Sequence, residues 1–292
     1  MNNDNKKVLV LGGTGFLGYY VLGALKEKHI STGVMIRRKL DDIDIPTEGY
    51  DILLGNILDE ASTKEAINKF KPDVIVNLVG IVGEKRPDIT FERVYINGTQ
   101  NIVDSAKEAG VKKIVSVSVM GADENSPQKY FKFKAESEKI IKNSGIVWTI
   151  FRPSIMFGWR SGFNPMMVKP ARRLLFVPMA GGGQHKIQPV AASTVAKAIA
   201  EACFGVGDNT AYNVMGPEVL TVREVTERVR EAMKTPKPVI GTPFWILRAL
   251  RIMNETQISM LTGNYTGDSD GLKKDFKVKD IYFDPMGEYP LF

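Results

Sequence analysis

Cysteine and histidine are scarce in this sequence. Its 292 residues include one cysteine and two histidines. A single thiol excludes an internal disulfide framework, which fits a reducing compartment. Cys203 lies in an apolar helical pattern and is expected in the core, and His185 has no cysteine, second histidine or paired acid near it in the sequence. We therefore expect no metal site.

Long apolar runs are missing too, and neither sign of charge dominates. No stretch approaches the roughly 18 apolar residues of a membrane-spanning helix, and the apolar run near the N-terminus is too short for a signal peptide. The 39 basic and 33 acidic residues give a net charge of +6. Because the basic residues are spread along the chain, we expect no nucleic-acid partner. We expect a cytoplasmic protein, and the lack of a G-x-S-x-G motif argues against a hydrolase.

The most informative stretch is VLVLGGTGFLG, residues 8–18. An apolar run predicts a short buried strand, and a helical pattern begins directly after the glycines. Gly12 allows a tight turn, Gly15 lets a pyrophosphate approach the backbone, and Gly18 lets helix and strand pack closely. The helix N-terminus adds N–H donors and a positive dipole end. This order predicts dinucleotide binding, although the spacing is G-x-x-G-x-x-G, and the alternative is a glycine-rich turn without a ligand.

Strands and helices alternate through the first half of the chain. The predicted strands cover residues 8–11, 30–36, 50–54, 73–79, 113–119 and 146–151, and the helices after the first cover about 62–70, 91–109 and 126–143. This alternation predicts an α/β fold with a Rossmann-type doubly wound parallel sheet. Its ligand site is expected at the carboxyl ends of the strands.

The sequence also indicates a second, smaller unit. We assign residues 1–157 to a dinucleotide-binding Rossmann domain that is completed by about 187–216. Residues 158–186 and 217–292 are assigned to a small C-terminal lobe for a substrate or a partner. Within it, residues 244–253 read FWILRALRIM, which is too short to span a bilayer. This segment either closes the lobe or makes a peripheral contact with a membrane or a partner.

Two arginines stand where the second strand ends. Arg37 and Arg38 lie about 20 residues past the glycines, where an acidic residue would accept the ribose 2′-hydroxyl of NAD. No acid stands there, and two guanidinium groups suit a 2′-phosphate through charge-assisted hydrogen bonds. The sequence therefore predicts NADP(H) in preference to NAD(H). The alternative is a solvated charge run at a strand end.

A tyrosine and a lysine four residues apart follow the fifth predicted strand. Tyr130 and Lys134 share one face of a helix. A lysine ammonium beside a tyrosine favours the phenolate and lowers the phenol pKa from about 10. Such a pair can pass a proton to or from a substrate oxygen while a nicotinamide moves a hydride. The alternative is an unrelated pair on a surface helix.

Further motifs surround these residues. They are GGTGFLG at 12–18, NLVG at 77–80, GTQNIVDSAKEAGV at 98–111, SVMGA at 118–122, RPSIMFG at 152–158, QPV at 188–190, PFWILRAL at 243–250 and MLTGNYTGD at 260–268. A sequence with these motifs resembles the short-chain dehydrogenase/reductase superfamily, on its extended or atypical branch. It is most similar to the NAD(P)H-binding group around the nucleotide-binding accessory subunit of respiratory complex I. The resemblance implies a Rossmann domain with a small C-terminal lobe.

The resemblance also implies site residues. Cofactor contacts are expected from Gly12, Thr14, Gly15, Phe16, Leu17, Gly18, Arg37, Arg38, Asn56, Ile57, Leu78, Val79, Gly80, Lys134 and Pro153, and catalysis from Tyr130, Lys134 and Ser118. Phe163, Asn164, Met166 and Met167 are expected either to form an apolar pocket near the nicotinamide or to pack within the lobe.

Three positions depart from the pattern of the superfamily. The hydroxyl that polarises the substrate carbonyl falls on either Ser118 or its neighbour Val119, whose side chains face opposite ways on a strand. The usual helix asparagine is Tyr95. The usual acidic residue after QPV is Thr194, which is expected to cap the next helix.

Members of the resembled group include reductases, isomerases and a subunit that holds NADPH without known turnover. Two functions therefore stand as hypotheses. The first is an NADP(H)-dependent oxidoreductase on a small carbonyl, quinone-like or sugar-like substrate. The second is a non-catalytic NADP(H)-binding subunit that docks on a redox assembly resembling complex I.

Overall fold

A seven-stranded parallel sheet forms the centre of the computed structural model, which describes residues 6–37, 48–84, 86–158, 173–263 and 265–285. Its strands are β1 (Lys7–Leu11), β2 (Ser31–Ile36), β3 (Asp51–Leu54), β4 (Val74–Asn77), β5 (Lys113–Val117), β6 (Val147–Pro153) and β11 (Thr210–Val214). Their order is β11-β6-β5-β4-β1-β2-β3, with every neighbouring pair parallel. This is the Rossmann-type α/β sheet that the sequence predicts.

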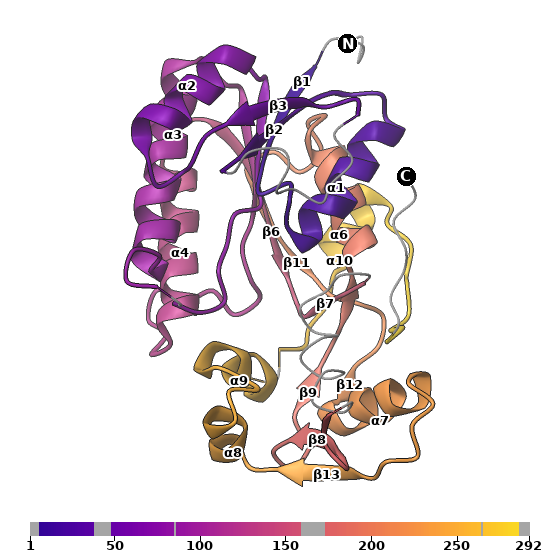
Figure 1. Cartoon of the computed structure of the whole chain (residues 1–292). Coiled ribbons are helices and arrows are strands. Elements are labelled where there is room, and N and C mark those ends of the chain that lie inside the picture. Colours follow the sequence, from indigo (N-terminus) through magenta and orange to yellow (C-terminus); the bar gives the residue numbers. More distant parts are fainter. Residues whose placement is uncertain (1–5, 38–47, 85, 159–172, 264, 286–292) are drawn as a thin grey trace.

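Helices cover both faces of this sheet (Figure 1). On one face lie α2 (Glu60–Phe70), α3 (Gly98–Glu108) and α4 (Lys129–Lys142); on the other lie α1 (Phe16–Glu27), α6 (Ala192–Ala202) and α10 (Asp270–Phe276). The position of strand β1 in the sheet explains why its sequence is apolar throughout. Val8 and Val10 enter the core on the α1 side, whereas Leu9 and Leu11 enter the core under α2 and α3. A strand buried on both faces reads as a continuous apolar run.

Local signals set the ends of several elements. The Asp59 side chain accepts hydrogen bonds from the first turn of α2, and Gly110, which follows α3, has φ +70°. Thr221 and Glu224 form the capping box of α7 (Val222–Ala232). Thr194 departs from its prediction. It lies buried inside α6, whose N-cap is Ala191, so it does not cap that helix.

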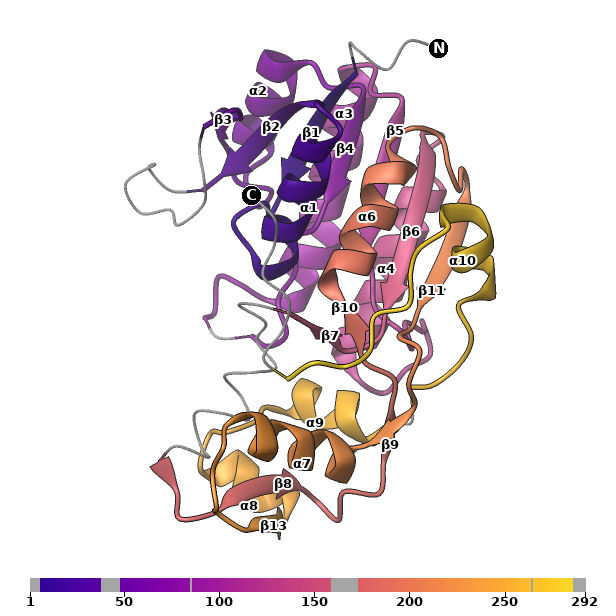
Figure 2. The ribbon, with the colours of Figure 1, turned by 90° about the vertical axis from the view of Figure 1, so that its right-hand side faces the viewer.

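A smaller lobe lies below the sheet in the views of Figures 1 and 2. Strand β8 (Val177–Ala180) pairs with β13 (Val239–Thr242), and β9 (Lys186–Ile187) pairs with β12 (Leu220–Thr221). Helices α7, α8 (Phe244–Ala249) and α9 (Glu255–Thr262) complete it, with their own apolar core. The short pair β7 (Met156–Phe157) and β10 (Val190–Ala191) links the lobe to the sheet.

Helix α10 lies outside the lobe, although Phe283 further along the chain packs in the lobe core. Leu272 and Phe276 of α10 join the core between the sheet and α6, and the Phe276 ring packs on Phe151 with centroids 5.4 Å apart. This part of 217–292 therefore lies against the sheet, although the sequence places it in the lobe. The position of the remaining boundaries stays a prediction.

The apolar segment 244–253 is only partly helical. Helix α8 ends at Ala249, and Leu247 is buried in the lobe. Trp245 and Leu250 are 68% and 56% exposed. Part of the segment therefore closes the lobe, and part faces outward. Within the described ranges, no helix has the length and apolarity needed to cross a membrane.

Candidate functional site

The glycine turn between β1 and α1 is shaped to hold a ligand. Gly12 has φ +84°, and a Cβ there would lie 3.1 Å from the Leu78 carbonyl carbon. At Gly18 a Cβ would lie 2.4 Å from the Gly13 oxygen, because α1 touches the turn at this residue. Gly15 is the N-cap of α1, and no side chain caps that helix and no acid stands in its first turn. These free N–H groups and the positive helix end suit a pyrophosphate.

Strand register gathers the other predicted cofactor contacts along the same edge. Leu11 pairs with Met35 of β2 and with Asn77 of β4, and Ile36 pairs with Leu54 of β3. The segments that follow these strands therefore lie in a row. They hold Thr14, Phe16, Leu17, Arg37, Asn56, Ile57, Leu78, Val79 and Gly80. Arg37 is exposed at the end of β2, and Arg38 lies outside the described residues.

Tyr95 fixes the loop after β4. Its hydroxyl accepts from the Ile81 N–H at 2.9 Å and donates to the Ile81 oxygen at 2.5 Å. It lies in a π-helical turn, η3 (Arg93–Asn97), which leads into α3. Such turns are frequent at functional sites. A Cβ at Gly80 would lie 3.2 Å from the Tyr95 hydroxyl, so the small size of glycine leaves room for the tyrosine at this position.

Lys134 is buried at the carboxyl end of β5. Its Nζ donates to the Val117 oxygen at 2.9 Å and lies 4.5 Å from the centre of the Tyr95 ring. Burial lowers its pKa to about 8, against an opposing effect of Glu138. A Cβ at Gly80 would lie 3.7 Å from Nζ, so the ammonium also reaches the predicted cofactor edge.

Tyr130 differs from the expectation for its pKa. Its ring packs edge-on against Phe91, Tyr95 and Phe131, with centroids 5.3 to 6.0 Å apart. Burial raises the pKa of its phenol, and no lysine contribution lowers it. The predicted depression by Lys134 is therefore wrong for this structure, because the lysine nitrogen faces Val117 and Tyr95. A phenol with a raised pKa stays protonated near neutral pH and can act as a proton donor.

We predict that Lys134 makes stability depend on pH in the alkaline range. Its pKa is about 8 when folded and 10.5 in the reference state, so the unfolded chain binds more protons between these values. Unfolding free energy should therefore rise with pH through this window. Urea unfolding measures this free energy at pH 7 and pH 9.5. Relative to the Lys134→Met variant, the native protein should be more stable at pH 9.5 than at pH 7. A gap that stays constant, as for the exposed Lys132→Met control, would contradict the assignment.

Ser118 and Val119 both border the site, but the Ser118 hydroxyl lies toward a buried ion pair. It forms no hydrogen bond of standard geometry, yet its proximity contributes to the low pKa of Glu138. Burial opposes ionisation of Glu138, and hydrogen bonds from Arg152 (Nε to Oε1, 2.8 Å) and Lys142 (3.0 Å) outweigh it. Ser118 is thus oriented in part by Glu138, and its catalytic role stays a prediction.

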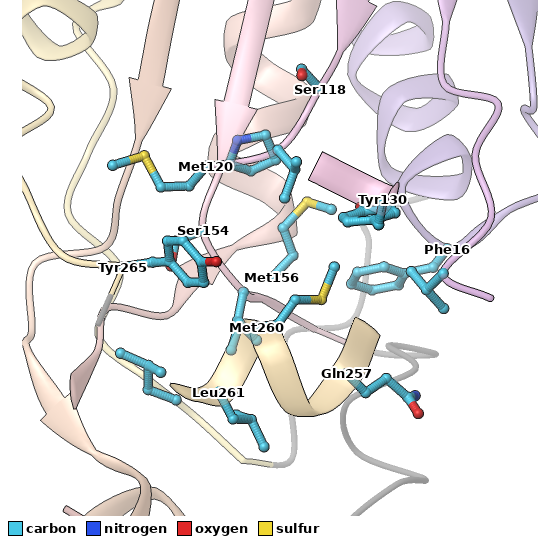
Figure 3. Close-up of a pocket in the computed structure, with 15 residues that line it drawn as sticks. Phe16, Ser118, Met120, Tyr130, Ser154, Met156, Gln257, Met260, Leu261 and Tyr265 are labelled. Carbon is cyan, nitrogen blue, oxygen red and sulfur yellow. The ribbon is translucent and has the colours of Figure 1, made fainter. Parts of the chain in front are cut away.

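A cavity of about 230 Å³ opens at the carboxyl ends of β5 and β6, between the sheet and the lobe (Figure 3). From the predicted set it contains Phe16, Ser118, Tyr130 and Pro153. Its other lining residues are Val82, Val119, Met120, Ser154, Ile155, Met156, Ile187, Gln257, Met260, Leu261 and Tyr265. The lining is mainly apolar, with a few hydroxyls and one amide.

The sequence did not identify the residues of α9 in this lining. Asn254 caps α9 through a box with Gln257, and its Nδ2 donates to the Val82 oxygen at 2.9 Å. Tyr265, just beyond α9, packs on Phe131 with ring centroids 5.4 Å apart. These contacts at the two ends of α9 reach the loop after β4 and helix α4 of the Rossmann part. Met260, Leu261 and Tyr265 belong to the motif MLTGNYTGD, which supports the family resemblance. The local sequence does not indicate that their side chains line a cavity.

Other predictions fall outside the site or outside the described residues. The pocket residues Phe163, Asn164, Met166 and Met167 lie outside the described ranges. Gly181 to Gly183 form a turn after β8 and open no helix. Cys203 is fully buried in the core. Among the described residues, no group of three or more metal-ligating side chains comes together.

Comparison with known proteins agrees with this geometry. The model of the family described as NAD(P)H-binding matches residues 12–204, from the glycine turn to the end of α6. The chain belongs to the NAD(P)H-binding family. The matched range includes the glycine turn, the uncapped start of α1 and most of the loops beside them, so the predicted cofactor contacts stay a prediction within a chain of this family.

Three curated relatives are informative. Over 316 residues the chain is 28% identical to "NADH dehydrogenase (ubiquinone) 1 alpha subcomplex subunit 9, mitochondrial" of Arabidopsis thaliana, covering 97% of this chain and 75% of the relative. It is 26% identical to the "NADH-ubiquinone oxidoreductase 40 kDa subunit, mitochondrial" of Neurospora crassa, covering 82% and 64%. It is 25% identical to the "NAD(P)H azoreductase" of Xenophilus azovorans, covering 78% and 74%.

Solved structures share the fold of this NAD(P)H-binding protein. A UDP-glucose 4-epimerase from Thermotoga maritima matches with a TM-score of 0.76 and 18% identity, covering 96% of both chains. A Thermus thermophilus UDP-glucose 4-epimerase in complex with NAD matches with a TM-score of 0.68 and 21% identity, covering 89% of this chain and 98% of that one. The chain thus has the fold of the extended short-chain dehydrogenases, as the sequence motifs predict.

Proposed function

We propose that this chain is an NADPH-dependent reductase of a small, largely apolar acceptor that carries a carbonyl or quinone-like group. The carrying observation is that the Tyr130 phenol borders an apolar cavity beside Phe16 of the cofactor turn. Cavities of about 150 Å³ admit benzene, so about 230 Å³ admits a substituted or two-ring compound. The apolar lining argues against the sugar-like substrates that the sequence left open.

Bound NADPH supplies the hydride for such a reduction. Tyr130, whose phenol is protonated near neutral pH, donates the proton to the acceptor oxygen. Lys134 lies between the end of β5 and Gly80, where its ammonium meets the cofactor ribose. Phe16, Met120 and Met156 exclude water and adapt to the acceptor surface.

We predict that Arg37 selects NADPH over NADH. Its exposed guanidinium follows β2, where a ribose 2′-phosphate lies when a dinucleotide occupies the glycine turn. Arg37→Ala should weaken NADPH binding by about 10- to 100-fold, as for loss of a charge-assisted hydrogen bond, and leave NADH binding unchanged. Calorimetric titration with both nucleotides measures this. Lys69→Ala, an exposed cation on α2, is the control; equal loss for NADPH and NADH would contradict the proposal.

A non-catalytic role is the second candidate. The relatives from Arabidopsis and Neurospora are named as subunits of NADH dehydrogenase, and Trp245 and Leu250 leave an apolar surface beside Arg248 and Arg251 on the lobe. Such a surface suits docking on a redox assembly, with NADPH stabilising the subunit by mass action.

Two measurements separate these candidates. Mass spectrometry of the purified protein identifies a retained nucleotide. Oxidation of NADPH is then followed against a panel of quinones, aromatic ketones and aldehydes. Turnover with an apolar acceptor supports the reductase, whereas retained NADPH without turnover across the panel supports the docking subunit.

A further inference from the structure

The cavity contains a buried hydroxyl that has no hydrogen-bond partner among the residues that the structure describes. The Ser154 side chain lines the cavity, the residue is 8% exposed, and its Oγ makes no hydrogen bond. The Ser154 backbone is held in place, since its N–H donates to the Val214 oxygen at 2.9 Å. A buried hydroxyl without a partner is costly, and such groups in native structures call for an explanation such as an absent ligand.

The hydrogen bonds of the other polar groups in the cavity show which of them are available to bind a ligand. The Gln257 Oε1 accepts from the Asn254 N–H at 2.9 Å, so this amide is partly used by the capping box. The Ser118 hydroxyl lies toward Glu138. Three hydroxyl groups are left to bind a ligand, those of Tyr130, Ser154 and Tyr265. They lie among methionine, leucine, isoleucine, valine and phenylalanine side chains.

These hydroxyls come from separate elements. Tyr130 projects from α4, whereas Ser154 follows β6, next to Pro153, whose oxygen accepts from the Met120 N–H at 3.0 Å. In Figure 3, Tyr130 is seen on one side of the Met156 side chain, and Ser154 and Tyr265 are seen on the other. An apolar ligand that reaches both sides needs a polar atom at each end.

We propose that Ser154 is a specificity-determining residue that donates a hydrogen bond to a second oxygen of a flat, apolar acceptor whose first oxygen meets Tyr130. The inference rests on the proposed reductase function and names the substrate class, a ring compound with two separated carbonyl oxygens. A hydroxyl is suited to this role because it donates to a carbonyl without placing a charge in an apolar cavity.

The test compares two probes with the same fused-ring skeleton. 1,4-Naphthoquinone has two carbonyl oxygens, whereas 1-tetralone has one. Their affinities are measured by calorimetry on the full chain saturated with NADP⁺, which cannot donate a hydride, so binding is separated from turnover. The native protein should bind naphthoquinone more tightly than tetralone. Cys203, the one thiol available for modification by a quinone, is fully buried.

Ser154→Ala should weaken naphthoquinone binding by about 3- to 10-fold, the effect of one neutral hydrogen bond, and leave tetralone binding unchanged. Ser259→Ala, at a half-buried serine of α9 whose hydroxyl donates to the Glu255 oxygen and which does not line the cavity, should change neither affinity. Equal weakening of both probes, no change for naphthoquinone, or no binding of either probe to the native protein would overturn the proposal. Failure of the reductase function is recognised separately, as selective naphthoquinone binding without any NADPH oxidation.

Discussion

Tyr130→Phe should lower the rate of NADPH oxidation by about 10²- to 10⁴-fold, the range that a positioned general acid contributes, while NADPH binding stays unchanged. The phenol borders the cavity and lies on the helix that also positions Lys134. Phenylalanine keeps the edge-on ring contacts with Phe91 and Phe131 and removes only the hydroxyl. Steady-state rates with a quinone acceptor, together with a nucleotide titration, measure both effects.

The control for this variant is Tyr282→Phe, at a tyrosine that is 66% exposed and does not line the cavity. It should leave both the rate and NADPH binding unchanged. If Tyr130→Phe retains the native rate, the phenol is not the proton donor. A loss of rate that is matched by a loss of NADPH binding would point to a packing role in the aromatic cluster.

Gly18→Ala should remove the retained nucleotide and lower the melting temperature by about 3–10 °C. A Cβ at this position would lie 2.4 Å from the Gly13 oxygen and 2.5 Å from the Gly12 oxygen. Both atoms are backbone, so no side chain can rotate aside and α1 must move away from the turn. The displaced helix carries the N–H groups that are predicted to bind the phosphates, so stability and nucleotide binding should fall together.

Gly182→Ala is the matched control, since a Cβ there meets nothing within 4 Å. Calorimetric melting and mass spectrometry of bound nucleotide compare the two variants. Retained nucleotide with an unchanged melting temperature in Gly18→Ala would contradict the close packing of α1 on the turn. A loss confined to nucleotide binding would show that the clash is absorbed locally, without the predicted cost in stability.

The sequence predicted the parts of the molecule whose physics is local. The apolar run of β1, the turn at Gly12 and the helical spacing of α1 are each encoded within a few residues. Parallel pairing then follows from the alternation of strands and helices, and it brings Arg37 and Gly80 to the same edge as the glycine turn. The capping box of Thr221 and Glu224 is likewise a short-range signal.

The parts that were missed depend on distant contacts. The pKa of Tyr130 is governed by burial among Phe91, Tyr95 and Phe131, and spacing within α4 carries no information on that burial. The wall that α9 provides for the cavity depends on the bond from Asn254 to the Val82 oxygen, across 172 residues of sequence. The free hydroxyl of Ser154 could not be foreseen, because only the fold shows that no protein group reaches it.

The two candidate functions use the same cofactor site and differ in the cavity. A subunit that only holds NADPH needs the glycine turn and Arg37, but it has no need for an apolar cavity with unpaired hydroxyls beside Tyr130. The exposed Trp245 and Leu250 lie on the lobe and suit a docking surface in either case. A reductase that also docks on an assembly therefore agrees with both the cavity beside Tyr130 and the exposed Trp245 and Leu250.

A single-turnover experiment tests the reductase proposal most directly. The protein is loaded with one equivalent of NADPH and mixed with excess 1,4-naphthoquinone, and the nicotinamide absorbance is followed beside the Tyr130→Phe variant and a protein-free mixture. We predict complete loss of the NADPH signal in the native protein at a rate well above both references. An NADPH signal that decays no faster than in the protein-free mixture would contradict the proposal and leave cofactor binding without chemistry.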